Sequence, residues 1–309
     1  MEEGYPKREG MAGNESPKIT SPAFLRRKLQ EKGLSPRRSL GQNFLVDENI
    51  LHKIISAATP TPGDFILDIG AGPGALSLAL AESGCHVIAL EKDKGLASFL
   101  REEAEERGFD RLQVVEGDVR RLKLRETCAD LWGEEPFMRK IKVVGNLPYY
   151  LTTPLLFQLL QGDLQLQLLV LMVQLEVARR IKAAPGSKEY GALSLLCRYY
   201  SRPRLLFKVP PSVFYPPPEV ASAVVSLEVL DRPPSEVGNE DLFWAIVKRA
   251  FQKRRKTLPN ALDGLHNLHK EQWAELIKKA GLSPSCRGET LSLEQFAYLA
   301  QISYNNRGI

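Results

Sequence analysis

The chain has 309 residues, enough for one large domain and a small second one. Hydrophobic residues make up 43% and charged residues 26%, and the net charge is +5, as in a folded, mildly basic soluble protein. There is no apolar run of the roughly 18 residues that a membrane span needs, and the acidic N-terminus lacks a signal core. We therefore expect a cytoplasmic protein with no membrane partner. Four widely spaced cysteines form no metal-binding pair, so we expect reduced thiols and no metal.

The first part of the chain is polar and then basic. Residues 1–22 mix Gly, Pro, Ser, Lys and Glu with few apolar residues, which predicts a disordered tail. Residues 24–38 carry six Lys and Arg residues against one Glu. Residues 47–58 have apolar side chains at helical spacing, which predicts a helix.

An alternation of strands and helices follows. Short apolar runs recur at intervals of roughly 25–30 residues, with helical patterns between them, and this predicts a Rossmann-like, mostly parallel sheet. The predicted strands are 65–69, 86–90, 112–116, 141–144 and 166–173. Two further runs, 205–209 and 220–229, flank a proline-rich loop and are expected to pair as an antiparallel edge.

The C-terminal part contains helical patterns and no strand pattern. A linker at 232–235 precedes predicted helices at 240–251, 255–262, 270–280 and 292–303. We therefore predict an α/β domain at 23–231 and a small all-helical domain at 236–309.

Glycines and acidic residues follow the first three predicted strands. The sequence from Asp68 to Gly74 is a glycine loop that allows the backbone to approach a ligand closely, with Gly70 as its first glycine. Glu91 follows the second strand, where a carboxylate can accept the two hydroxyls of a ribose. Asp118 follows the third strand and can accept from an adenine amino group. Nicotinamide dinucleotides and S-adenosylmethionine share that ribose, so this pattern alone does not separate a dehydrogenase from a methyltransferase.

The fourth predicted strand runs into Asn146-Leu147-Pro148-Tyr149. An adenine amine is a poor nucleophile because its lone pair is delocalised into the ring. Two acceptors at its two N–H groups favour the tetrahedral, positively charged nitrogen that attacks a methyl sulfonium. The Asn146 side-chain oxygen and the Leu147 carbonyl are suited to this role, and Tyr149 can stack on the base. The motif therefore predicts methyl transfer from S-adenosylmethionine to an adenine amine. A dehydrogenase would have no use for this motif.

These motifs resemble the small-subunit ribosomal RNA adenine dimethyltransferases, the KsgA family, over roughly residues 24–303. The segment from Gly41 to Leu45 matches that family's first motif. The resemblance implies a class I methyltransferase fold in which the cofactor is contacted by Asn43, Leu45, Gly70, Glu91, Asp118 and Asn146. It also implies that Phe214, in the sequence Phe-Tyr-Pro-Pro-Pro, stacks on the second face of the target adenine.

The resemblance also implies RNA contact by the C-terminal domain. A predicted basic helix at 247–262 carries six cations within nine residues and no counter-charge, which favours phosphate contact over a solvated face. These cations are Lys248, Arg249, Lys253, Arg254, Arg255 and Lys256. The implied substrate is two adjacent adenines near the 3′ end of small-subunit rRNA in the assembling subunit, dimethylated at N6 by a monomer. The alternatives are a large-subunit methyltransferase of the macrolide-resistance type and a non-catalytic assembly factor.

Overall fold

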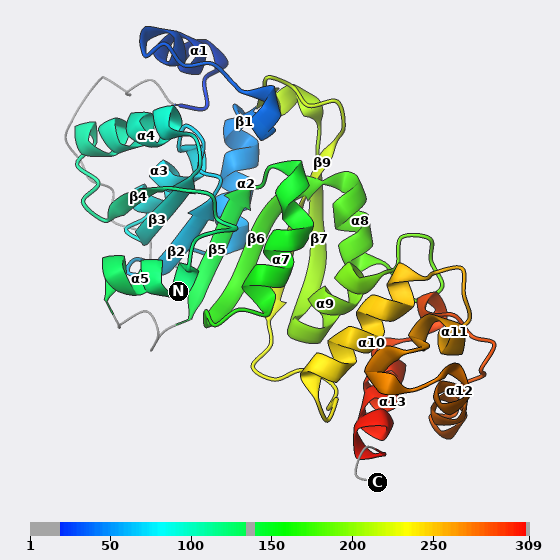
Figure 1. Ribbon diagram of the computed structural model, residues 1–309. Coiled ribbons are helices and arrows are strands. Elements are labelled where there is room, and N and C mark those ends of the chain that lie inside the picture. Colours follow the sequence, from blue (N-terminus) through cyan, green and yellow to red (C-terminus); the bar gives the residue numbers. More distant parts are fainter. Residues whose placement is uncertain (1–18, 134–139, 307–309) are drawn as a thin grey trace, which may run out of the picture.

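A seven-stranded sheet forms the centre of the α/β domain, in the order β4-β3-β2-β5-β6-β9-β7 (Figure 1). The computed structural model describes residues 19–133 and 140–306. The strands are β2 (Phe65–Ile69), β3 (His86–Glu91), β4 (Leu112–Glu116), β5 (Ile141–Asn146), β6 (Leu166–Gln174), β7 (Ser201–Val209) and β9 (Ser222–Val229). Strands β2 to β6 pair in parallel, and β9 is antiparallel to both β6 and β7. The predicted parallel sheet with an antiparallel edge is confirmed.

Helices cover both faces of the sheet because both faces of its strands are apolar. In β3, for example, Val87 and Ala89 belong to one core and Ile88 and Leu90 to the other. The first core is closed by α2 (Glu48–Ala58), α3 (Ala75–Glu82) and α4 (Lys94–Glu106). The second is closed by α5 (Leu124–Trp132), α7 (Thr152–Leu160), α8 (Leu175–Lys182) and α9 (Ala192–Tyr200).

An N-terminal helix precedes the sheet, which the basic pattern did not predict. Helix α1 (Pro22–Glu31) begins at the N-cap Ser21 and packs on α4, where Lys28 Nζ lies 3.2 Å from Glu103 Oε1. Ile19, within the predicted tail of residues 1–22, is buried in the first core, so that boundary was too late. Residues 1–18 lie outside the described part of the chain.

The C-terminal domain is helical, as predicted, and its apolar side chains form a third core together with residues of the α/β domain. Its helices are α10 (Glu240–Gln252), α11 (Leu258–Leu262), α12 (Lys270–Lys279) and α13 (Leu293–Asn305). The prediction of one basic helix at 247–262 is wrong. Helix α10 ends at Gln252, and Lys253 is already non-helical, with ψ 46°. Pro259 explains the break, because in a continuous helix it would remove a hydrogen bond and clash with the preceding turn.

Short elements bring distant segments together above the sheet. Strand β1 (Phe44–Leu45) pairs antiparallel with β8 (Phe214–Tyr215). The 3-10 helices are η1 (Arg38–Leu40), η2 (Tyr149–Leu151), η3 (Pro211–Val213), η4 (Leu265–Asn267) and η5 (Gly288–Thr290). None of the helices in the described ranges is long and apolar enough to span a membrane.

Candidate active site

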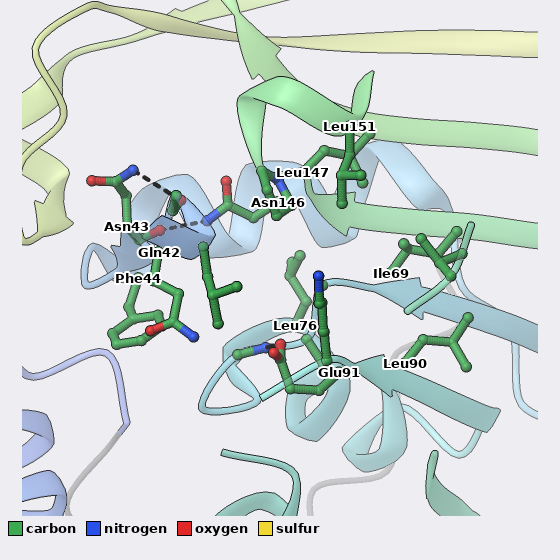
Figure 2. A pocket seen from close by; sticks show the side chains of 18 of the residues that line it. Gln42, Asn43, Phe44, Ile69, Leu76, Leu90, Glu91, Asn146, Leu147 and Leu151 are labelled. Atoms are coloured by element: carbon green, nitrogen blue, oxygen red, sulfur yellow. Dashed lines mark hydrogen bonds between the residues drawn. The ribbon is translucent and has the colours of Figure 1, made fainter. Parts of the chain in front are cut away.

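A cavity lies at the carboxyl ends of β2, β3, β4 and β5 (Figure 2). Ligands of parallel α/β sheets bind at this edge. Five segments line the cavity, at 40–45, 69–76, 90–92, 117–119 and 146–151. The structure thus brings together the predicted cofactor residues Asn43, Leu45, Gly70, Glu91, Asp118 and Asn146, as well as Leu147 and Tyr149.

The glycine loop after β2 packs directly against the Asn-Leu-Pro-Tyr motif. Gly70 has φ +76°, and a Cβ there would lie 3.3 Å from Pro148 Cδ and 3.4 Å from the Asn146 carbonyl oxygen. Only glycine combines this left-handed conformation with so close an approach. The loop therefore joins the cofactor side of the cavity to the predicted site of chemistry.

Glu91 forms a buried wall of the cavity and is 7% exposed. One carboxylate oxygen accepts from the backbone N–H of Gly72 at 2.7 Å and the other from that of Asp93 at 2.8 Å. Burial raises the pKa of Glu91, while these backbone hydrogen bonds act in the opposite direction. Each oxygen has a further lone pair, so Glu91 remains able to accept the hydroxyls of a ribose.

Asp118 is engaged by two cations at the cavity edge. Its oxygens accept from Arg120 Nε at 3.0 Å and Nη2 at 2.6 Å, and Lys92 Nζ lies 3.2 Å away. Arg120 holds the pKa of Asp118 well below its usual range, so this group is ionised. The Arg120 guanidinium also lies over the ring of Tyr150, 5.8 Å from its centroid. An adenine amino group that binds Asp118 therefore has to displace part of this ion pair.

Asp68, at the end of β2, does not belong to the cavity wall. The side chain is fully buried, and Oδ2 accepts from the Ser77 hydroxyl of α3 at 2.5 Å. Burial raises the pKa of Asp68 to about 7. Of the three acidic residues that the sequence places at one sheet edge, only Glu91 and Asp118 line the cavity.

The Asn146 amide has a defined orientation. Its Nδ2 donates to the backbone carbonyl of Asn43 at 2.8 Å. Figure 2 shows this nitrogen turned toward Asn43 and the amide oxygen turned away from it. The side chain of Asn43 bends back to the Gly41 carbonyl, at 3.2 Å. The arrangement leaves Asn146 Oδ1 as an acceptor for a substrate donor.

Tyr149 is fixed beside Asn146. Its hydroxyl lies 2.9 Å from the Ser222 hydroxyl at the start of β9. The preceding Leu147 N–H donates to the Met172 carbonyl of β6 at 3.1 Å, and Pro148 has ψ 130°. The motif is thus tied to both β6 and β9, which holds the Tyr149 ring in one position.

Phe214 is not brought to the cavity. The side chain is 4% exposed and belongs to the apolar core under β1, where Phe214 pairs with Leu45. Stacking on a target base, as the resemblance implies, requires this side chain to turn out of the core. Its predicted role stays a prediction.

The predicted RNA-contacting cations are divided between α10 and the turn after it. Lys248 is an exposed residue of α10. The sequence suggested that the six cations have no partners, but two of them do. Arg254 Nη2 lies 3.2 Å from Glu289 Oε2, and Arg249 donates to the Asp263 carbonyl. The exposed cations of the turn are Lys253, Arg255 and Lys256.

Three polar residues of the site were not predicted, namely Gln42, Asp93 and Ser222. Gln42 lies inside the recognised first motif, and Asp93 follows Glu91 by two residues. Both could have been found from the sequence, because each lies within two residues of a predicted cofactor-binding residue. Ser222 is visible only in three dimensions, because its partner Tyr149 lies 73 residues earlier in the chain.

Comparisons with known proteins agree with this geometry. Residues 33–303 match the family model described as ribosomal RNA adenine dimethylase. A ribosomal RNA small subunit methyltransferase A from Pelotomaculum thermopropionicum is 47% identical over 290 residues, which cover 91% of this chain and 96% of that protein. The corresponding protein from Moorella thermoacetica is 46% identical over 274 residues, 88% of this chain and 94% of its own length.

Two solved structures share the fold. A dimethyladenosine transferase from Plasmodium falciparum has a TM-score of 0.71 at 24% identity, covering 86% of this chain and 98% of that one. The 23S rRNA methyltransferase ErmE has a TM-score of 0.61 at 23% identity, covering 84% of this chain and 99% of that one. At these identities the similarity shows the fold alone.

Proposed function

Because this chain belongs to the ribosomal RNA adenine dimethylase family, we propose a function for its cavity and its Asn146 motif together. The chain transfers methyl groups from S-adenosylmethionine to N6 of adenine in small-subunit rRNA. Three relatives that are 42–47% identical are named as small-subunit methyltransferases, which disfavours the large-subunit alternative. The observation that carries the function is the oriented Asn146 amide at the edge of a cavity walled by Glu91.

The residues that line the cavity fit the cofactor in their chemistry. Glu91 would hold the ribose and the glycine loop would pass beside the methionine part, with Leu45 and Leu90 as apolar walls. S-adenosylmethionine supplies a methyl group on a positively charged sulfur. The role of the chain is to hold an adenine amine in line with that methyl group and to exclude water.

Asn146 and Leu147 accept the two N–H groups of the target amine while Tyr149 supports the ring. The amine lone pair forms the new N–C bond as the S–C bond breaks, and the sulfur keeps the bonding electrons. The nitrogen then carries a positive charge, which the Asn146 oxygen stabilises. The extra proton leaves to water, and a second transfer gives the dimethylated amine.

The finer substrate assignment is part of this proposal. The target is two adjacent adenines near the 3′ end of small-subunit rRNA, presented in the assembling subunit to a cytoplasmic monomer. The resemblance in the motifs supports this assignment.

The test is methylation of purified small and large ribosomal subunits that lack the modification, followed by mass spectrometry of nuclease fragments. We expect dimethyladenosine at two adjacent positions of small-subunit rRNA and none in large-subunit rRNA. Modification of the large subunit alone would contradict the proposal, as would cofactor binding without methyl transfer to either subunit.

A further inference from the structure

Gln42 lines the cavity, and its side-chain amide is bonded within the protein. Its Oε1 accepts from the backbone N–H of Arg37 at 2.7 Å, and its Nε2 donates to Asp93 Oδ2 at 3.2 Å. Both ends of the amide are therefore engaged within the protein. The two contacts fix the position of the Gln42 amide at the cavity wall.

Asp93 connects this contact to the wall of the cavity. The residue is 4% exposed and is the N-cap of α4, where Oδ1 accepts from the Gly95 N–H at 2.9 Å. Its own N–H donates to Glu91, and Arg37 Nε lies 3.3 Å from Oδ2. A nearly buried carboxylate with several donors is an anchor of fixed position.

The residue after Gln42 touches the chemistry. Asn43 presents its carbonyl to the Asn146 amide nitrogen, and this contact turns Asn146 Oδ1 away from Asn43. The 42–43 segment is thus bonded to α4 on one side and to the end of β5 on the other. Because Gln42 and Asn43 are adjacent in the chain, a shift of Gln42 would move the Asn43 carbonyl that orients the Asn146 amide.

We propose that Gln42, held by Asp93, is a positioning residue for methyl transfer that acts through Asn43 on Asn146. This inference rests on the proposed function and adds to it a route from the cofactor wall to the catalytic amide. It differs from a cofactor-binding role because its effect on rate passes through Asn146.

A double-mutant cycle tests this route by single-turnover methyl transfer to small subunits at saturating cofactor. Gln42→Ala should slow the transfer by about tenfold, as expected for loss of a charge-assisted hydrogen bond. Combined with Asn146→Ala, it should cause no further loss beyond Asn146→Ala alone, because the amide that it orients is gone. Losses that multiply, or an unchanged rate in Gln42→Ala, would overturn the proposal.

A reversed pair keeps the test valid if Gln42→Ala unfolds. Gln42→Glu alone places two carboxylates face to face, and Asp93→Asn alone places two amide nitrogens face to face, so each should be slow. Together they restore a donor–acceptor pair and keep an oxygen for the N-cap of α4. Recovery of most of the wild-type rate supports the proposal, and a combination as slow as the slower single variant refutes it.

Lys32→Ala is the matched control. Lys32 lies on the same N-terminal segment as Gln42, and its replacement breaks an ion pair with Glu102 of α4 without touching Gln42. Its rate should equal that of the wild type. Wild-type protein that methylates no small subunit would refute the proposed function itself. An active wild type with multiplying losses would refute only the role of Gln42.

Discussion

Asn146 makes one bond that orients it and leaves one atom for the reaction. Because the acceptor oxygen matters most when the target nitrogen becomes positive, Asn146→Ala should reduce turnover by roughly 10²–10³-fold. RNA affinity should stay near that of the wild type. Tyr149→Phe is the control in the same motif, because it keeps the ring and loses only the Ser222 contact, so its loss should be smaller.

The second methyl transfer sharpens this expectation. A monomethylated amine has one N–H left and can use the Leu147 carbonyl alone, so Asn146→Ala should slow the first transfer more than the second. Single-turnover rates on unmodified and monomethylated RNA measure this difference. Wild-type rates on both substrates in Asn146→Ala would remove the proposed role.

Glu91 has a structural role and, in the proposed function, a binding role as well. Glu91→Ala should weaken cofactor binding about tenfold to a hundredfold, since charge-assisted contacts to the ribose are lost. The midpoint of thermal unfolding should also fall, because Gly72 and Asp93 lose their acceptor. Calorimetric titration with the cofactor and a melting curve check the two effects, and RNA affinity should stay nearly constant. Unchanged cofactor affinity would contradict the ribose assignment.

Single residues were predictable where a strand end or a motif marked them. Glu91 and Asn146 line the cavity as expected because each is the last residue of a parallel strand. The Gln42–Asp93 contact was not predicted, since nothing local pairs two polar residues 51 positions apart. The burial of Phe214 was missed because it depends on β1, which is too short to have a period of its own.

At the scale of elements, strands were predicted better than helices. Two predicted strands, at 65–69 and 112–116, have the bounds of β2 and β4. Their apolar runs are continuous because both faces are buried. Helices α1, α5, α8 and α9 were not predicted. In α1, only Leu25 and Leu29 are buried, and several of the other residues are cations. Two buried apolar positions were too few to show a helical period, so the segment was described by its charge alone.

Asp68 links strand β2 to helix α3 and makes this pairing sensitive to pH. Its pKa is about 7 in the folded chain against an ordinary 3.8, so the folded state keeps a proton that the unfolded state releases. Its contribution to stability is therefore full below the ordinary value and is lost as the pH rises toward 7.

Asp68→Asn removes this titration and keeps an acceptor for Ser77. Relative to wild type, its free energy of unfolding should rise by about 1–3 kcal/mol between about pH 5 and pH 8. Urea unfolding at the two pH values measures the change. Asp47→Asn, at the half-buried N-cap of α2, should follow the wild type at both. A pH-independent difference for Asp68→Asn would rule out a buried, titrating carboxyl.

The turn between α10 and α11 presents its cations differently from a helix. Lys253, Arg255 and Lys256 are exposed, so replacing all three with Gln should weaken RNA binding and lower the log–log salt slope by ~0.7–0.9 per lost contact. Lys270, Lys278 and Lys279 of α12, replaced in the same way, provide a control of equal charge in the same domain. The test is RNA binding measured over a series of salt concentrations. If the log–log salt slopes of the two variants are equal, the RNA does not contact the turn.

At the scale of the whole molecule, the two domains share one core. Tyr190, Leu195 and Tyr199 of the α/β domain are buried with the side chains of α10 and α13. Tyr199 stacks on Phe243 with ring centroids 5.0 Å apart, and the Tyr190 hydroxyl donates to the Leu291 carbonyl at 2.8 Å. The basic turn is therefore held at a fixed place relative to the cavity.

The turn itself is also tied to the first domain. Arg254 donates to the Lys188 carbonyl at 3.1 Å, and the Gly186 N–H donates to the Glu289 carbonyl at 2.8 Å. Since Arg254 also pairs with Glu289, this cation joins the domains. Lys248 and the exposed cations of the turn are the ones that remain available for the proposed RNA contacts. In the proposed function, the geometry of the interface would thus set the distance between the phosphate contacts and the reacting adenine.

Opening the interface should separate RNA binding from catalysis. Tyr199→Ala removes a buried ring and leaves a cavity between the domains, which should cost about 3–5 kcal/mol. Calorimetry should then show two unfolding transitions where the wild type shows one. Cofactor affinity should be retained, because the cavity lies at the other end of the sheet strands, whereas methyl transfer to small subunits should fall. Tyr298→Ala, an exposed residue of α13, should unfold and react like wild type. If Tyr199→Ala keeps full activity while unfolding in two steps, the fixed placement of the domains does not contribute to the reaction.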